Sequence, residues 1–166
     1  MSRSRVPCVP VPVRAEVVTG ANLQSMTDTR PSHPRTPDEW QQAARGTLLE
    51  RTGIELTHVG PEGASGTMPV AGNTQPAGLL HGGATAALAE TLGSVAAQMH
   101  AGPGRAAVGI ELGITHHRGV RRGTVHGTAT ALHLGRSTAS YEIVVMDDDG
   151  RRVATARLTC MVLDAP

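Results

Sequence analysis

One carboxylate, Glu90, stands in a helix-like stretch that carries no other charged side chain. Apolar residues repeat there at intervals of four, three and four, which predicts a helix over 82–99 with one apolar stripe: Leu88, Leu92, Val95 and Met99. Glu90 lies about 200° around the helix from Leu88, and Ser94 shares its face. A partly enclosed carboxylate can act as a base or nucleophile, whereas the alternative is a helix carboxylate that points to water.

A glycine-rich segment, Gln75-Pro-Ala-Gly-Leu-Leu-His81-Gly82-Gly83, leads directly into this helix. Unpaired backbone amides at a helix start point outward with the positive end of the helix dipole, which suits a developing oxyanion. The segment lacks the glycine spacing and the Lys-Ser/Thr pair of a phosphate-binding loop. The alternative interpretation is a flexible loop in which His81 caps the helix.

The spacing of His81 and Glu90 limits how they can cooperate. Nine residues of helix separate them by about 13 Å along the axis, so the two side chains of one chain cannot contact the same carbonyl. If both belong to one site, two chains must supply it, with antiparallel helices side by side. We expect the small residues Ala87, Gly93 and Ala97 to permit that contact.

A second cluster, His133-Leu-Gly135-Arg136-Ser137, lies between two predicted strands. A glycine, a hydroxyl group and an arginine at a strand end can hold a phosphate, although a solvated basic turn is equally consistent with the pattern. Metal binding is not predicted, because no pair of the eight histidines has the spacing of a helical zinc motif. Cys160 alternates in phase with apolar neighbours, which indicates a core residue.

The elements that must position these residues predict an α+β domain. Thr36-Pro37-Asp38-Glu39 resembles a capping box, so we expect a helix from there to about Glu50. A hairpin over 54–70, the helix over 82–99 and four strands then follow: 108–116, 124–134, 140–146 and 153–163. In the first of these strands the phase of Val108 to Ile114 predicts that His116 faces the helix and His117 faces outward. This order indicates an antiparallel sheet curled around one long helix.

Composition narrows the possible functions of the 166 residues. The net charge of +1 and 1% aromatic residues argue against nucleic-acid binding, and no run of apolar residues is long enough to span a membrane. Prolines interrupt the short apolar stretch near the N-terminus, so we do not expect a secretory signal. We expect residues 1–35 to form a disordered tail, with Met26 as a possible alternative start, and residues 36–166 to form the domain. Two distant cysteines, Cys8 and Cys160, fit a cytoplasmic location.

Together these segments resemble the hotdog-fold acyl-CoA thioesterases, in particular the 4-hydroxybenzoyl-CoA, phenylacetyl-CoA and 1,4-dihydroxy-2-naphthoyl-CoA thioesterase type. The resemblance rests on the segments 75–83, 88–94, 108–116 and 133–135, in this order and spacing. It implies a curved antiparallel sheet wrapped around a central helix, a homodimer at minimum and commonly a homotetramer, with active sites at the dimer interface. It implies no cofactor.

The resemblance also implies a role for each candidate residue. Glu90 would be the nucleophile or general base for hydrolysis of an acyl-CoA thioester, and Ser94 would orient it or the lytic water. The Gly82 amide, with Gly83 beside it, would polarise the thioester carbonyl, which Gln75 and His81 would position. His116 and His133 would lie near the substrate, and Gly135, Arg136 and Ser137 would hold the nucleotide end of coenzyme A. The alternative is a non-catalytic module that binds or senses acyl-CoA on the same fold.

Overall fold

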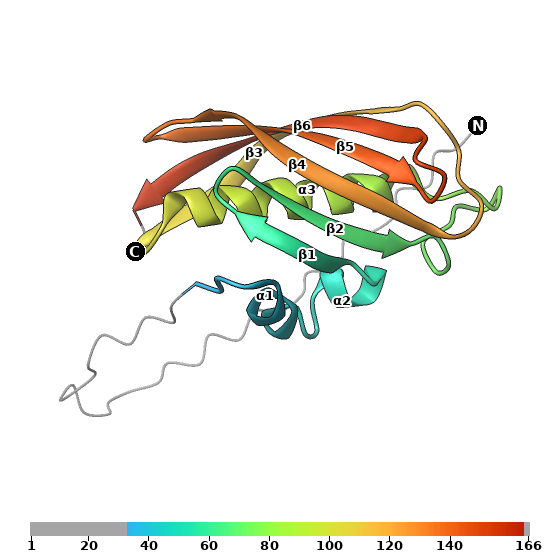
Figure 1. The fold of residues 1–166 in the computed structure, drawn as a ribbon, viewed down its shortest axis with the longest axis horizontal. Helices are drawn as coiled ribbons and strands as arrows, with labels where there is room; N and C mark the ends of the chain where they lie inside the picture. The colour runs from blue at the N-terminus through green and yellow to red at the C-terminus, as the bar shows by residue number, and fades with distance from the viewer. Residues whose placement is uncertain (1–32, 165–166) are drawn as a thin grey trace, which may run out of the picture. The chain divides into compact units, whose positions relative to one another are not determined.

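The computed structural model describes residues 33–164. It contains, in chain order, α1 (Pro37–Ala43), α2 (Leu48–Thr52), β1 (Glu55–Gly60), β2 (Gly63–Pro69), α3 (Gly82–Ala101), β3 (Arg105–His116), β4 (Thr124–Leu134), β5 (Thr138–Asp147) and β6 (Arg152–Asp164) (Figure 1). The expected tail lies outside the described residues except for residues 33–35, and Cys8 and Met26 also lie outside them.

The first helical region is two short helices, so the prediction of one helix to Glu50 was wrong. One half of the expected capping box is present, because the Thr36 hydroxyl accepts a hydrogen bond from the Glu39 amide at 3.3 Å. The Glu39 side chain accepts from the Arg35 amide at 2.6 Å and not from the Thr36 amide that a capping box requires. The chain then turns at Gly46, whose φ of 76° is in the left-handed region that glycine adopts most readily, and α2 begins at Leu48. The Gln41 side chain ties α1 to the start of the sheet by donating to the Ile54 carbonyl at 3.0 Å.

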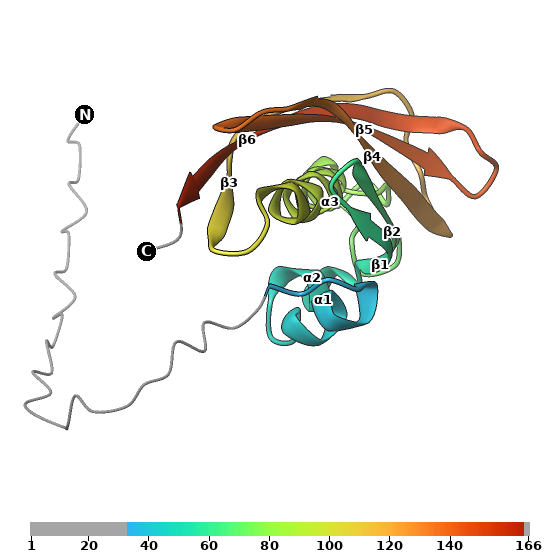
Figure 2. The same cartoon turned by 60° about the vertical axis from the view of Figure 1, so that its left-hand side comes forward.

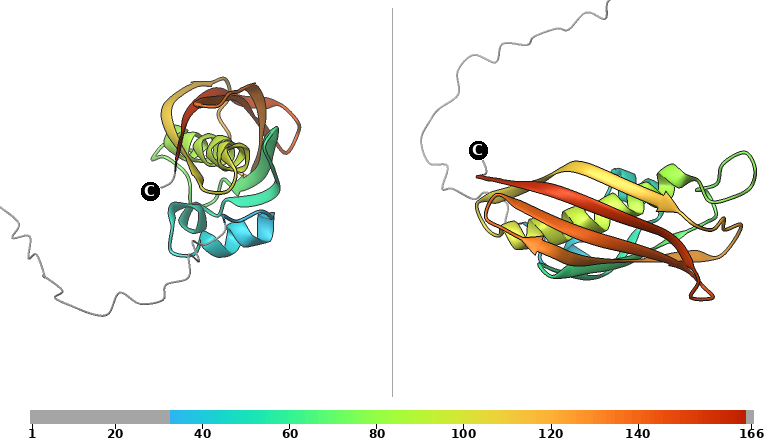
Figure 3. Two further views of the ribbon diagram at one scale, coloured as in Figure 1. Left: turned by 90° about the vertical axis from the view of Figure 1, so that its left-hand side faces the viewer. Right: turned by 90° about the horizontal axis from the view of Figure 1, so that it is seen from above.

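All six strands form one antiparallel sheet in the order β1-β2-β4-β5-β6-β3. The sheet curves around α3, which runs along its concave face (Figures 2 and 3). The predicted hairpin and the four later strands are all present. Strand β4 has its predicted bounds, and β3, β5 and β6 are each one to three residues longer at one or both ends. The expected α+β architecture of a curved antiparallel sheet around a long helix is therefore confirmed.

The core lies between α3 and the sheet. Leu88 and Leu92 are fully buried, and burial of such a side chain contributes roughly 2 kcal/mol. Glycine allows the close packing at Gly127, since a Cβ there would collide with the Leu92 side chain. Gly93 has the same role, because a Cβ there would collide with the Leu158 side chain. Among residues 33–164, no helix is long and apolar enough to cross a membrane.

The small residues of α3 correct one expectation about helix–helix contact. Gly93 and Ala97 are buried against the chain's own sheet, so they are not available to a second helix. Their small size serves helix–sheet packing, which requires close approach of the two backbones.

Strand β3 is at one edge of the sheet and contains a bulge. The register with β6 shifts between Gly109 and Glu111, so Ile110 is an extra residue. The expected inward phase of the whole strand was therefore wrong in its first half: Gly109 faces α3, while Val108 and Ile110 are 49% and 53% exposed. After the bulge, Leu112 and Ile114 are partly buried against the core.

Candidate active site

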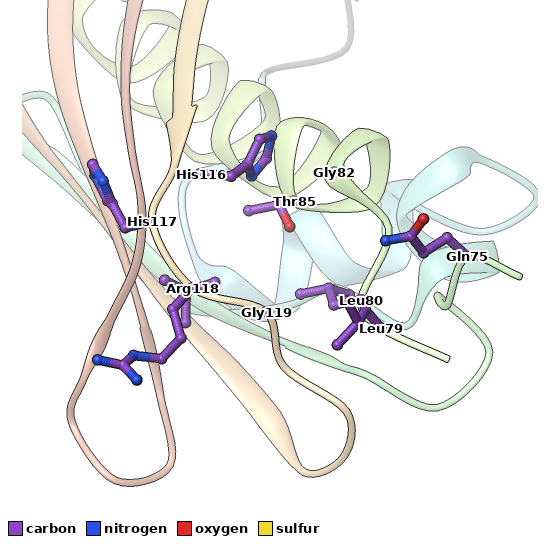
Figure 4. Close-up of a pocket in the computed structure, with 10 residues that line it drawn as sticks. Gln75, Leu79, Leu80, Gly82, Thr85, His116, His117, Arg118 and Gly119 are labelled. Atoms are coloured by element: carbon purple, nitrogen blue, oxygen red, sulfur yellow. The ribbon is translucent and has the colours of Figure 1, made fainter. Parts of the chain in front are cut away.

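A pocket of about 360 Å³ opens at the N-terminal end of α3 (Figure 4). Gln75, Gly82 and His116 line it, together with further residues from the loop before α3 and from the chain after β3: Leu79, Leu80, Thr85, His117, Arg118, Gly119 and Val153. A tight turn presents Gln75, because its carbonyl accepts from the Gly78 amide at 2.9 Å and Gly78 has a φ of 72°. The sequence predicted the first three residues but did not single out the others for this pocket.

The start of α3 leaves one backbone amide available at this pocket. His81 is the N-cap, and its Nδ1 accepts a hydrogen bond from the Gly83 amide at 2.8 Å. Within the described part of the chain the Gly82 amide has no hydrogen-bond partner. The helix start therefore has a free donor at Gly82, whereas the amide of Gly83 is occupied by the cap.

His116 lies against Gly82, as the phase of the end of β3 predicted. A Cβ built on Gly82 would be 3.0 Å from Nε2 of His116. His117 points to the opposite face, where its Nε2 lies 3.0 Å from the Thr155 hydroxyl, yet it still contributes to the rim of the pocket (Figure 4).

Glu90 and Ser94 form a second group, one face of α3 turned toward β3. The Ser94 hydroxyl donates to Oε1 of Glu90 at 3.0 Å, and both residues are partly buried. The shared helix face that the sequence predicted is therefore present. Glu90 is outside the pocket that Gln75, Gly82 and His116 line.

Cys160 lies beside this carboxylate, in the strand that pairs with β3. It is fully buried, and its register partner is Gly109. Burial, reinforced by the negative charge of Glu90, raises the pKa of the Cys160 thiol to about 11, although a hydrogen bond with Ser94 opposes the rise. A protonated buried thiol is a poor nucleophile, which agrees with its interpretation as a core residue.

The third group is the β4–β5 turn that carries Gly135, Arg136 and Ser137, with His133 just before it. Two side chains that the sequence reasoning missed hold this turn. His100, in the last turn of α3, places Nε2 2.9 Å from the Gly135 carbonyl, and Arg105 donates to the Arg136 carbonyl at 2.8 Å. A histidine near the end of a helix gave no signal of this contact, because the partner lies 35 residues later.

These three groups follow one another along α3. Glu90 is eight residues after Gly82, or about 12 Å along the axis, and His100 with the β4–β5 turn is about 15 Å further on. One chain therefore holds the amide of Gly82 and the carboxylate of Glu90 too far apart to act on the same carbonyl group.

Comparisons with known proteins identify the family. The family model of the Thioesterase superfamily matches residues 77–154. The proofreading thioesterase EntH of Cronobacter turicensis is 50% identical over 119 residues, which cover 71% of this chain and 87% of that relative. The chain belongs to the thioesterase superfamily.

Solved structures agree with this assignment. A thioesterase of Haemophilus influenzae has a TM-score of 0.75 at 33% identity and covers 80% of this chain and 94% of its own. A Gln-to-Ala mutant of a thioesterase from Pseudomonas aeruginosa also has a TM-score of 0.75, at 34% identity over 81% of this chain and 98% of its own. This thioesterase therefore has the expected hotdog fold, and it is a thioester hydrolase.

Proposed function

We propose that this thioesterase hydrolyses acyl-CoA thioesters, with Glu90 as the catalytic carboxylate. The observation that carries the proposal is the partly buried Glu90 carboxylate, which Ser94 holds by a 3.0 Å hydrogen bond on the side of α3 that faces the edge strand. It is the one acidic side chain of α3, and the face it occupies is next to the open edge of the sheet.

The active site is completed by a second copy of the chain. Edge strand β3 has unpaired backbone groups and two exposed apolar side chains, Val108 and Ile110, and such an edge pairs readily with another strand. Antiparallel pairing of two β3 strands reverses the direction of the adjoining α3 helices. The start of one α3 then approaches the middle of the other, which offsets the 12 Å that separates Gly82 from Glu90 in one chain. Pairing of two such dimers gives the homotetramer that we expect from the family resemblance.

The chemistry follows from the three groups. The Gly82 amide of one protomer donates to the thioester oxygen, and Gln75, His81 and His116 position the acyl group. Glu90 of the other protomer either removes a proton from water, which attacks the carbonyl carbon, or attacks that carbon itself to form an anhydride that water then cleaves. In both routes the C–S bond breaks, the products are a free acid and coenzyme A, and the thiolate of coenzyme A takes up a proton.

The nucleotide end of coenzyme A binds at the β4–β5 turn. Arg136 supplies a positive charge there and Ser137 a hydroxyl group, and both are exposed at the turn that His100 and Arg105 hold. His133 and Gly135 complete this surface. Phosphate groups of the nucleotide match these donors.

The acyl group occupies the pocket beside Gly82. Its lining combines apolar and polar side chains, and its only rings are the imidazoles of His116 and His117, with no Phe, Tyr or Trp. Aryl-CoA thioesters remain the first substrates to test, because the family resemblance points to them. A proofreading role is a second candidate, since the relative from Cronobacter turicensis carries that name. A panel of acyl, aryl and carrier-like thioesters separates a selective enzyme from one with broad tolerance.

The test of the catalytic carboxylate is Glu90→Gln, compared with Glu111→Gln as a matched control. Glu111 is an exposed carboxylate on β3 that lies 3.4 Å from Arg157. We expect Glu90→Gln to lower kcat by about 10² to 10⁴-fold with an unchanged melting temperature, and Glu111→Gln to retain activity. A fully active Glu90→Gln enzyme would remove Glu90 from the mechanism.

The role of the Gly82 amide as a hydrogen-bond donor can be tested with two substitutions that add similar bulk. Gly82 is the first residue of α3, where proline is tolerated, and His81 has φ −70° and ψ 133°, which a residue before proline can adopt. Gly82→Ala and Gly82→Pro both add a Cβ near His116, but only proline removes the N–H. We expect the proline variant to be a further 10² to 10³-fold slower than the alanine variant, and equal rates would exclude the amide as the donor.

Mixing two inactive variants tests whether the site is shared. Glu90→Ala and Gly82→Pro homodimers, each inactive, should form heterodimers with one site that carries both changes and one that carries neither. Equal mixing makes half of the dimers heterodimers, so about 25% of wild-type activity should return. No recovery after confirmed subunit exchange would place both residues in sites within single chains.

Hydrolysis also separates the enzyme from a module that only binds or senses acyl-CoA. Release of free thiol from any acyl-CoA substrate supports the enzyme, whereas calorimetric binding without thiol release across the panel supports the binding module. We propose the cytoplasm as the site of action, a reducing compartment that suits the buried unpaired thiol of Cys160.

A further inference from the structure

The carboxylate of Glu90 rests directly on the backbone of Gly109 in β3. A Cβ built on Gly109 would overlap Oε1 of Glu90 and would lie 3.4 Å from Cδ and 3.6 Å from Oε2. No side chain larger than that of glycine fits between β3 and this carboxylate as it now lies. Gly109 has no positive φ, so the requirement for glycine comes from space and not from backbone conformation.

The bulge in β3 places Gly109 opposite the carboxylate. The register pairs Gly109 with Cys160, then skips Ile110 and resumes at Glu111 with Thr159. Bulges occur next to active sites, where they redirect side chains. Here the bulge allows Gly109 to face α3 while the apolar Val108 and Ile110 remain exposed.

A second contact from α3 holds this part of β3 in place. The Gln98 side chain donates to the Arg105 carbonyl at 3.0 Å and accepts from the Ala107 amide at 3.0 Å. Both backbone groups lie within four residues of Gly109. The beginning of β3 is therefore fixed against the same helix that carries Glu90.

We propose that Gly109 is a positioning residue for hydrolysis: its missing side chain lets Glu90 place Oε1 on β3 and against the Ser94 hydroxyl, so that Oε2 is the reacting oxygen. This inference rests on the proposed catalytic role of Glu90. It gives the two carboxylate oxygens of Glu90 different roles, because Oε1 is held in contact with Ser94 and Gly109. Within residues 33–164, Oε2 has no hydrogen-bond partner.

The first test compares Gly109→Ala with Gly113→Ala on the same strand. A Cβ on Gly113 meets only Oε1 of the exposed Glu111 side chain, at 3.3 Å, and that side chain can move aside. A methyl group at Gly109 must displace the Glu90 carboxylate by about 1 Å, and misplacement of this size can cost about 10²-fold in rate. We expect that loss in kcat with little change in KM for Gly109→Ala, and near wild-type kinetics for Gly113→Ala.

The second test is a double-mutant cycle with Glu90→Asp, which shortens the side chain by one methylene group. In the wild-type background the shorter side chain should lower kcat. In the Gly109→Ala background it should cost nothing further or restore activity, because the carboxylate is withdrawn from the added methyl group. Additive losses would show that Gly109→Ala acts away from the carboxylate and would overturn the inference.

These results separate the inference from the function on which it rests. An active Glu90→Gln enzyme rejects the proposed catalytic role, whereas an inactive Glu90→Gln with an active Gly109→Ala rejects only the positioning role of Gly109. Should Gly109→Ala fail to fold, a crystal structure of the wild-type enzyme with a non-hydrolysable thioester analogue decides. A structure in which Oε1 contacts Gly109 and Oε2 points toward the analogue carbonyl supports the inference. The reverse arrangement of the two oxygens overturns it.

Discussion

The exposed apolar side chains of edge strand β3 give a quantitative prediction for assembly. Val108 and Ile110 are 49% and 53% exposed. Full burial of such a side chain contributes 1.5–3 kcal/mol, so covering the exposed half contributes roughly 1 kcal/mol. Two side chains on each of two protomers then contribute about 4 kcal/mol to a dimer formed through β3. That energy corresponds to about 10³-fold in the dissociation constant.

The perturbation is the double variant Val108→Asp with Ile110→Asp. It removes the apolar contribution and adds like charges along the paired edge, so the dimer dissociation constant should rise by at least about 10³-fold. Sedimentation equilibrium over a dilution series measures this change. Activity should fall in parallel with the dimer fraction, because in a monomer Gly82 and Glu90 are too far apart to act on the same carbonyl group.

The matched control is Leu48→Asp on α2. Leu48 is 57% exposed, and α2 leads into β1 at the opposite edge of the sheet. This variant should keep both the wild-type assembly and the wild-type rate. The reasoning is refuted if the β3 variant remains dimeric at all dilutions, or if a folded monomer retains full kcat.

Three further predictions concern the scaffold. Leu92→Ala should lower the free energy of unfolding by about 3 kcal/mol, because Leu92 is fully buried; denaturant titration measures it, and a loss below about 1 kcal/mol would contradict the packing. Hydrogen bonds from Arg151 hold the pKa of the buried Asp147 carboxyl below its usual 3.8. The carboxylate therefore stabilises the fold above that pH and loses this effect as pH falls through the lowered pKa. Thermal melts of wild type and Asp147→Asn should differ at pH 7 and converge in acid, and a constant difference would refute the assignment. Cys160, with a thiol pKa of about 11, should resist alkylation in the native protein at pH 7 and react in denaturant, as peptide mass mapping can show.

The sequence predicted the fold well wherever local signals and the apolar pattern agreed. Strand β4 was predicted at its observed bounds, and α3 extends only two residues beyond its predicted end. The break between α1 and α2 was missed because Gly46 lies inside a stretch with few other helix-breaking residues. The phase of β3 was misjudged because a bulge adds one residue without any change in composition, so alternation alone could not reveal it.

The sequence predicted most of the residues of the candidate site but few of the contacts between them. The pairing of Glu90 with Ser94 followed from helical spacing, and the contact of His116 with Gly82 followed from strand phase. The contacts of His100 with the β4–β5 turn and of Gly109 with Glu90 join segments far apart in the chain. Such contacts depend on the three-dimensional path of the backbone, which spacing along the sequence does not encode locally.

The helix cap at His81 determines more than where α3 begins. Because Nδ1 accepts the Gly83 N–H, it carries no proton of its own, and the neutral ring must hold its hydrogen on Nε2. The imidazole therefore presents an N–H donor at Nε2, the ring nitrogen that does not cap the helix. A single hydrogen bond from the backbone thus sets the tautomer of this ring. It also sets the kind of group to which the ring can donate, which is a carbonyl or another acceptor.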